Sequence, residues 1–196
     1  MKRMGWRDLY WLDIEALANA FKPANATLEF VKYYTSRSRD PRSQGVANRQ
    51  QIYWRALKTL PKVQIIEGKI LPRDSQCEAD CKMGFVRLQE KETDVKLGID
   101  VIHDCLTKKV QGIILIAADT DQVPTLTMVR DLKLSISVKL AFPPLDVRRK
   151  ASKELSDLAG KTFFIGESLL RSCQMPDPLS TASGQLTRPD KWRRRR

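Results

Sequence analysis

Apolar positions along the chain follow helical spacing in some stretches and strand spacing in others. A helical pattern begins after Asp13, which suits an N-cap, and Pro23 ends it. A run rich in β-branched and aromatic residues predicts a strand over 27–34. By the same criteria we expect helices over about 46–60, 94–106, 122–132 and 147–158, and strands over 63–71, 85–88, 112–117 and 135–142.

Three of these segments make more specific predictions. The run 112–117 (GIILIA) is continuously apolar, as in a strand buried on both faces of a parallel sheet. Segment 135–142 alternates, which predicts an edge strand. Segment 72–84 is polar and predicts a loop. The helix over 94–106 has an apolar face formed by Val95, Gly98, Ile99, Ile102 and Leu106.

The alternation of strands and helices predicts a three-layer, Rossmann-like α/β domain over residues 1–175, with a mostly parallel sheet. The chain opens on a helix, whereas in doubly wound folds the first strand lies in the sheet interior. Without that strand, its neighbours flank unpaired backbone groups, which are costly when buried. We therefore expect the first central strand to be missing; the alternative is that something else fills its place. Residues 176–196 are rich in Pro, Ser and Thr and end in KWRRRR, which predicts a disordered basic tail.

Charge and composition narrow the partners. The chain has 35 Lys plus Arg against 23 Asp plus Glu, a formal net charge of +12. This excess favours polyanions, with nucleic acid first and an anionic membrane surface second. No apolar run approaches the roughly 20 residues that span a bilayer, and the N-terminus has no apolar region of a signal peptide. Four cysteines without a dense framework suit a reducing compartment, so we expect a cytoplasmic protein.

Acidic residues cluster in two short stretches. Asp94 begins a predicted helix, whereas Asp119 and Asp121 follow the apolar strand 112–117. Carboxylates at the C-terminal ends of parallel strands converge, and they repel one another unless a hard divalent cation neutralises them. Mg²⁺ held in this way activates water and stabilises the charge that develops on a phosphodiester. The alternative is that Asp94 and Asp121 are helix N-caps, while Asp119 needs no such role.

The runs EKETDVKLGIDVIHDCL, GIILIAADTDQVPTLTMVRDL, KLAFPP and SLLRSCQMPDPL resemble the NYN domain branch of the PIN-like, LabA-like ribonucleases, over about Tyr10 to Leu179. The resemblance implies a Rossmann-like sheet and an Mg²⁺ or Mn²⁺ site for RNA cleavage, with Asp94, Asp119 and Asp121 at the family's acidic positions. Members of this family open with an apolar strand ending in Asp-Gly-x-Asn, which this sequence lacks. If the start codon is misplaced, we expect the protein to be a metal-dependent ribonuclease. If instead the sequence is a degenerate copy, we expect a non-catalytic RNA-binding or protein-interaction module.

Basic residues are candidates for RNA contacts. Arg37, Arg39 and Arg42 follow a predicted strand end, where the crevice of an α/β sheet would open, and Arg49 begins the next helix. These four residues are either phosphate contacts or part of a solvated loop and the start of its helix.

Cys77 and Cys81 lie close together in a polar segment. A structural zinc ion needs about four ligands, so we expect metal-free loop cysteines unless a homo-oligomer brings two pairs together.

Overall fold

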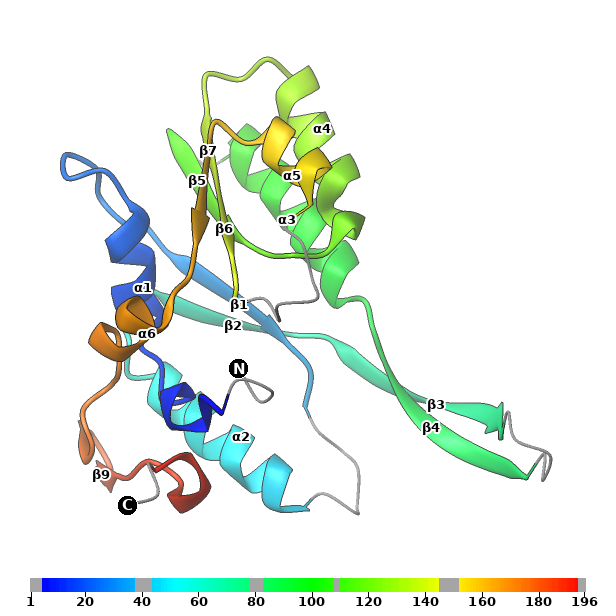
Figure 1. The fold of residues 1–196 in the computed structure, drawn as a ribbon, viewed down its shortest axis with the longest axis vertical. Coiled ribbons are helices and arrows are strands. Elements are labelled where there is room, and N and C mark those ends of the chain that lie inside the picture. The colour runs from blue at the N-terminus through cyan, green and yellow to red at the C-terminus, as the bar shows by residue number, and fades with distance from the viewer. Residues whose placement is uncertain (1–4, 38–43, 78–82, 108–109, 145–151, 194–196) are drawn as a thin grey trace.

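The chain folds into a mixed α/β structure whose parallel strands are divided between two sheets (Figure 1). The computed structural model describes residues 5–37, 44–77, 83–107, 110–144 and 152–193. Strand β1 (Val31–Thr35) pairs in parallel with β2 (Val63–Glu67). A second parallel sheet has the order β5-β6-β7, formed by β5 (Gly112–Ile116), β6 (Ser137–Phe142) and β7 (Lys161–Phe164). The predicted α/β class with parallel strands is confirmed.

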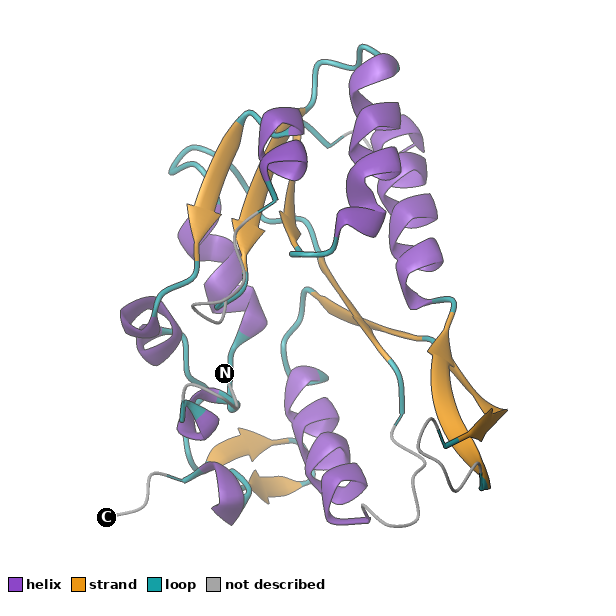
Figure 2. Cartoon of the chain, turned by 45° about the vertical axis from the view of Figure 1, so that its right-hand side comes forward, coloured by secondary structure: helices purple, strands orange, loops and turns teal. Residues whose placement is uncertain are grey.

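Helices alternate with these strands, as Figure 2 shows. Helix α1 begins after Asp13, whose carboxylate accepts a hydrogen bond from the Ala16 backbone N–H at 2.8 Å. The predicted N-cap is therefore confirmed. The helices are α1 (Ile14–Phe21), α2 (Gln44–Leu57), α3 (Thr93–Thr107), α4 (Val123–Asp131), α5 (Lys153–Leu158) and α6 (Glu167–Ser172). Short 3₁₀ turns are η2 (Arg7–Leu9), η4 (Thr120–Gln122) and η5 (Asp190–Trp192).

Helix α1 packs against both parallel sheets. Ile14 lies in an apolar cluster with Tyr33 of β1. Leu17 and Phe21, one and two turns further along, lie in a second cluster with Ile114 of β5. The helix therefore joins the two sheets on one face.

Helix α3 joins the same two sheets on the other face. The Tyr34 hydroxyl of β1 donates a hydrogen bond to Asp100 at 2.8 Å. Leu97 packs in a cluster with Leu115 of β5. Each of these strand residues directly follows the one that contacts α1, and successive strand residues point to opposite faces. The helices and the strands thus form three layers, with α1 and α3 covering both sheets.

The middle layer is interrupted between β1 and β5. Within the described ranges, β1 pairs only with β2, and β5 pairs only with β6. Strand β5 is correspondingly less buried than its apolar sequence predicts: Leu115 is its one buried residue, and Ile116 is 40% exposed. The expectation that β5 is buried on both faces is therefore wrong. The expected interruption of the sheet is present among the described residues.

Strand β6 occupies the centre of its sheet, so the prediction of an edge strand is wrong. β7 pairs along its second edge, and Leu140, Ala141 and Phe142 are all fully buried. The alternating polar residues that suggested an edge lie at the start of the strand, where Ser137 is exposed. Alternation alone reflects one buried face and says nothing about whether a second strand pairs alongside.

Strands β3 (Lys69–Gln76) and β4 (Gly84–Lys91) form an antiparallel arm that projects from the rest of the molecule (Figures 1 and 2). The predicted loop over 72–84 is therefore wrong for its first part. Pro72 lies within β3 opposite Leu88. Proline is compatible with a strand whose second edge is unpaired, because no ladder partner needs its missing N–H.

The predicted apolar face of α3 is mostly exposed. Val95, Ile99 and Leu106 are 65%, 61% and 57% exposed, whereas Gly98 and Cys105 are buried. Tertiary contacts determine this orientation: a Cβ placed on Gly98 would lie 2.6 Å from the Thr125 hydroxyl of α4, so the glycine allows the two helices to approach closely.

The C-terminal segment is folded through residue 193, which corrects the prediction of a disordered tail over 176–196. Strands β8 (Leu179–Thr181) and β9 (Gly184–Leu186) form an antiparallel pair, and Leu186 is 6% exposed. Trp192 makes an edge-to-face contact with Tyr53 of α2, with ring centroids 6.0 Å apart. These buried apolar groups order a segment whose polar composition suggested disorder. Residues 194–196 lie outside the described ranges.

Candidate functional site

Two of the predicted acidic residues follow the C-terminal end of β5. Asp119 is the N-cap of η4, and its carboxylate accepts a hydrogen bond from the Asp121 backbone N–H at 3.2 Å. Asp121 itself lies in the first turn of η4. Asp119 therefore caps η4, although the sequence suggested a capping role for Asp121 and none for Asp119. Both side chains are exposed.

Asp94 lies in the first turn of α3, and its backbone is tied to the segment that carries the other two acids. The Gln122 side-chain amide donates a hydrogen bond to the Asp94 carbonyl at 3.3 Å, and its own oxygen accepts one from Thr125 at 3.2 Å. Gln122 is 2% exposed. It acts as an anchor between α3 and η4, and sequence spacing gave no indication of this role. The Asp94 side chain is exposed.

The three aspartates are thus neighbours in the fold, yet they do not form a preassembled cation site. Across the described residues, no group of three or more His, Cys, Asp or Glu side chains is arranged to hold a metal ion. Three exposed carboxylates repel one another when nothing neutralises them. As placed, the residues do not fit the predicted Mg²⁺ or Mn²⁺ site.

A second acidic pair on α3 faces β1 and has a different role. The Lys32 ammonium lies 2.6 Å from Asp104 and 3.5 Å from Asp100. Burial, with the hydrogen bond and negative charge of Asp100, raises the pKa of Tyr34 far above its usual value. The single ammonium balances one of the two negative charges, and the Tyr34 hydroxyl donates a hydrogen bond to Asp100, so this network ties α3 to β1.

The predicted RNA-contacting arginines are partly described. The Arg37 guanidinium lies 3.3 Å from Glu67 and 5.3 Å from the centre of the Trp54 ring, at the C-terminal ends of β1 and β2. Arg49 is half-buried on α2. Arg39 and Arg42 lie outside the described ranges, and so does Cys81.

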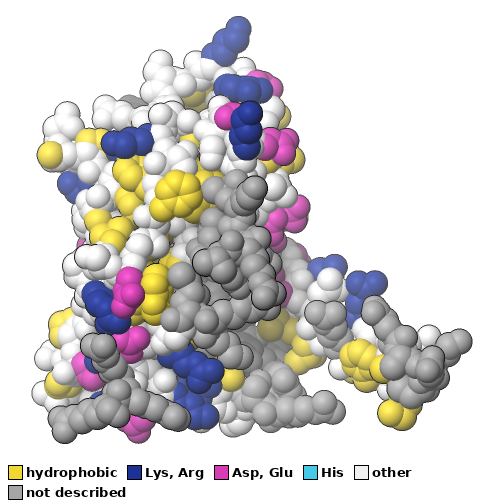
Figure 3. Space-filling model, viewed as in Figure 1, with side chains coloured by type: hydrophobic (Ala, Val, Ile, Leu, Met, Phe, Trp, Pro, Cys, Tyr) yellow, Lys and Arg dark blue, Asp and Glu magenta, His cyan; other side chains and the backbone are white. Residues whose placement is uncertain are grey.

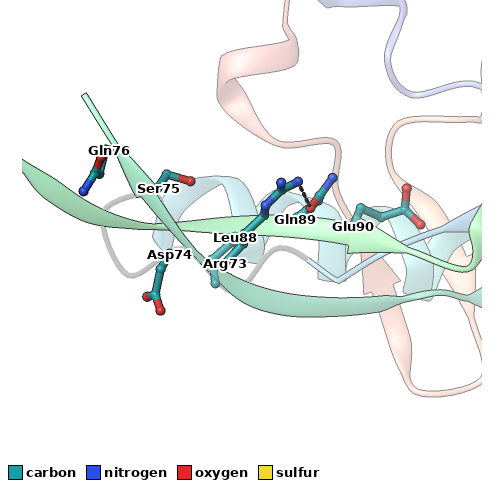
Figure 4. A pocket seen from close by; sticks show the side chains of 7 residues that line it. All are labelled: Arg73, Asp74, Ser75, Gln76, Leu88, Gln89 and Glu90. Atoms are coloured by element: carbon teal, nitrogen blue, oxygen red, sulfur yellow. Dashed lines mark hydrogen bonds between the residues drawn. The ribbon is translucent and has the colours of Figure 1, made fainter. Parts of the chain in front are cut away.

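Two open hollows lie on the arm, and the second is close to the start of α3, because a Cβ on its lining residue Gly68 would meet the Thr93 hydroxyl, next to Asp94. The first is lined by Arg73, Asp74, Ser75, Gln76, Leu88, Gln89 and Glu90 (Figure 4). The second lies at the base of the arm and is lined by Arg37, Glu67, Gly68, Lys69, Ile70 and Leu71. Figure 3 shows basic and hydrophobic side chains exposed on the projecting arm. The arm therefore carries a second candidate surface, which adjoins the start of α3 at its base.

Comparison with known proteins gives one distant similarity. The chain is 25% identical over 179 residues to the 6-hydroxy-3-succinoylpyridine 3-monooxygenase HspA of Pseudomonas putida (strain DSM 28022 / S16). The alignment covers 83% of this chain and 57% of the relative's length, so the chain spans little more than half of that protein. No protein-family model and no solved structure matches. None of the helices in the described part of the chain has both the length and the apolar character that crossing a membrane requires.

Proposed function

We propose that this chain is a divalent-metal-dependent ribonuclease domain of the NYN, PIN-like class, with Asp94, Asp119 and Asp121 as its acidic residues. The observation that carries this proposal is the hydrogen bond from Gln122 to the Asp94 backbone, which brings the start of α3 beside the segment that follows β5. Ligands of open α/β sheets bind at the C-terminal ends of the strands, and both acidic segments lie there or adjoin it.

The site needs further ligands before it can bind a cation. Asp94, Asp119 and Asp121 are exposed and are not gathered around one point. Strands β1 and β5 each have an edge that no described strand pairs with. An additional parallel strand between them would satisfy these edges, and its C-terminal end would add side chains beside β5. We propose that the acidic site is complete only with such a strand.

A non-catalytic RNA-binding module is the second candidate. The unassembled acidic side chains favour it, because nothing in the described residues shows how a phosphodiester would be activated. The net charge of +12 supports RNA binding equally in both candidates.

The similarity to a monooxygenase does not extend that activity to this chain. At 25% identity over part of the relative's length, the alignment supports distant similarity alone. Incubation with 6-hydroxy-3-succinoylpyridine is a suitable side assay, and we expect no product from it.

The proposal is tested by RNA cleavage in Mg²⁺ and in Mn²⁺. The assay compares the chain, a form supplied with an apolar strand that can pair between β1 and β5, and Asp119→Asn in each. Asp131→Asn is the matched control, because Asp131 is equally an exposed acid but lies at the end of α4, 3.4 Å from Arg130. EDTA-treated samples give the background.

We expect the form with the added strand to cleave RNA. Its cleavage rate should fall on the order of a hundredfold in Asp119→Asn and stay unchanged in Asp131→Asn. Cleavage that Asp119→Asn leaves intact would overturn the assignment of the site. RNA binding without cleavage in any form would favour the non-catalytic module.

A further inference from the structure

The β3–β4 arm separates its charged residues by face. Lys69 pairs directly with Lys91 in the ladder, and Arg73 lies four residues beyond Lys69 on the same strand, so all three cations occupy positions of one face. Asp74 and Glu90 each adjoin one of these residues in sequence and therefore occupy positions of the opposite face. Figure 4 shows Arg73 and Asp74 projecting from opposite sides of the arm.

The basic face is unfavourable for the hairpin itself. Like charges directly opposite one another destabilise an antiparallel pair, and Lys69 and Lys91 stand in this relation. Glu92 partly compensates Lys69, with its carboxylate 2.9 Å from the ammonium. The Arg73 guanidinium donates a hydrogen bond to the neutral Gln89 amide at 3.2 Å, and no acid among the described residues forms an ion pair with it. An anionic ligand across this face would remove the repulsion.

The same face exposes two large apolar side chains. Leu71 is 50% exposed and stands between Lys69 and Arg73, and Phe85 is 51% exposed opposite Ser75. Cations interspersed with an exposed aromatic ring are the arrangement that holds single-stranded nucleic acid, through phosphate contacts and base stacking. A two-stranded ribbon of this length is marginally stable alone, so a ligand would also stabilise the arm.

The basic face adjoins the region that follows β1, where Arg37 lies 3.3 Å from Glu67. The hollow at the base of the arm is lined by Arg37, Lys69 and Leu71, among others. Arg37 is one of the residues that the sequence suggested for phosphate contacts. The arm and the end of β1 therefore form one continuous border of that hollow.

From these observations we infer that the face of the arm carrying Lys69, Leu71, Arg73, Phe85 and Lys91 binds single-stranded RNA. This inference rests on the proposed function for the identity of its ligand, but it concerns a surface separate from the acidic site. An anionic membrane is less favoured, because only two of these five residues are apolar, and Leu71 is separated from Phe85 by Arg73.

The test measures the affinity of the full chain for a fluorescent single-stranded RNA in EDTA, as a function of salt concentration. Arg73→Gln/Lys91→Gln removes two cations from the face. Lys58→Gln/Lys153→Gln is the matched control: it removes the same charge from exposed lysines on α2's end and on α5. The arm substitutions relieve like-charge repulsion, so the hairpin should keep its fold, which circular dichroism checks.

We expect the salt dependence, the slope of log K against log salt, to fall by about 1.4 in the arm variant, because each phosphate contact on a single strand contributes about 0.7. Affinity at about 0.1 M salt should fall on the order of tenfold, while the control variant retains the wild-type slope. Phe85→Leu keeps an apolar side chain but loses the ring, and it should weaken binding about fivefold or more.

Equal effects of the two double variants would overturn the inference, because binding would then depend on net charge alone. Binding of the chain to phosphatidylserine vesicles, lost in Arg73→Gln/Lys91→Gln while RNA affinity is unchanged, would assign the face to a membrane instead. Wild-type protein that binds no RNA would refute the proposed function along with the inference. RNA binding that the arm variant leaves unchanged would refute the inference alone.

Discussion

The substitution Lys32→Met tests whether the ion pair between β1 and α3 holds these two elements together. The Lys32 ammonium lies 2.6 Å from Asp104, and the two side chains are 17% and 6% exposed. Methionine keeps the apolar stem of the lysine and removes the charge. Asp104 would then keep only the His103 imidazole, whose Nδ1 lies 3.4 Å away, while Asp100 would lose its 3.5 Å contact with the ammonium.

The expected loss of stability follows from this burial. Breaking a fully buried ion pair by removing one partner costs about 3–5 kcal/mol. Because Lys32 retains some contact with water, we expect a smaller loss of about 2–3 kcal/mol in the free energy of unfolding. For a chain of this size each kcal/mol shifts Tm by about 2–4 °C, so Tm should fall by about 4–12 °C.

Thermal unfolding followed by circular dichroism measures this effect, with Lys69→Met as the matched control. The Lys69–Glu92 distance of 2.9 Å is similar, but these side chains are 66% and 39% exposed. Solvent screening makes exposed pairs weak, so the control should show no measurable change in Tm. Lys32→Met/Asp104→Leu should be less destabilised than the sum of its single changes, because it removes the buried carboxylate and leaves only the more exposed Asp100, which keeps its hydrogen bond from Tyr34.

Equal Tm values for Lys32→Met and Lys69→Met would refute this reasoning. So would strict additivity in the double variant, since it would show that the two charges do not interact across the β1–α3 contact.

Three other properties follow from burial. Leu140→Ala removes a fully buried side chain from the central strand β6 and should cost about 3 kcal/mol in urea unfolding; a loss below about 1 kcal/mol would show that this core is not packed as described. Burial raises the pKa of Tyr34 and Tyr53 above the usual value of 10.0, so these phenols ionise at a lower pH in the unfolded chain than in the folded chain. The unfolded state then binds fewer protons, and stability should be full below about pH 10 and fall as pH rises further. Phenolate absorbance that appears well before unfolding and is lost in Tyr34→Phe or Tyr53→Phe would contradict this. Burial also raises the pKa of the Cys105 and Cys173 thiols, so iodoacetamide should label them far more slowly at about pH 8 in the folded chain than in urea, as peptide mass spectrometry would show.

Local patterns in the sequence predicted where helices and strands form better than they predicted how these elements pack. Asp13 could be identified as an N-cap because capping depends on neighbouring residues alone. The position of β6 at the centre of its sheet depends on β7, which follows much later in the chain, and no spacing within β6 reports that pairing. The orientation of α3 depends on Gly98 meeting Thr125, which is again a contact between distant segments.

The arm was predicted only in part: the strands expected over 63–71 and 85–88 overlap β3 and β4, but Pro72 and the nearby polar residues suggested a loop between them. Residues 72–84 contain few apolar side chains, so this part of the arm gave no clear strand signal. The C-terminal segment was missed for a related reason. Leu186 and Trp192 pack into a core formed by the N-terminal half of the chain, which composition alone does not reveal.

The acidic region was predicted in part. The placement of Asp119 and Asp121 after β5 follows from the apolar run that precedes them, and the structure bears this order out. The contact of Gln122 with Asp94 and the pairing of Lys32 with Asp104 join residues far apart in sequence, so no motif spacing indicated them.

Binding of Mn²⁺, measured by electron paramagnetic resonance on the chain carrying an added apolar strand, tests the central claim most directly. If Asp94, Asp119 and Asp121 belong to one metal site, the wild-type form should bind Mn²⁺, and Asp119→Asn should weaken the affinity by about tenfold or more. Asp131→Asn should leave the affinity unchanged. Equal Mn²⁺ affinity in the wild type and in Asp119→Asn would contradict the claim that these aspartates form the metal site of a ribonuclease.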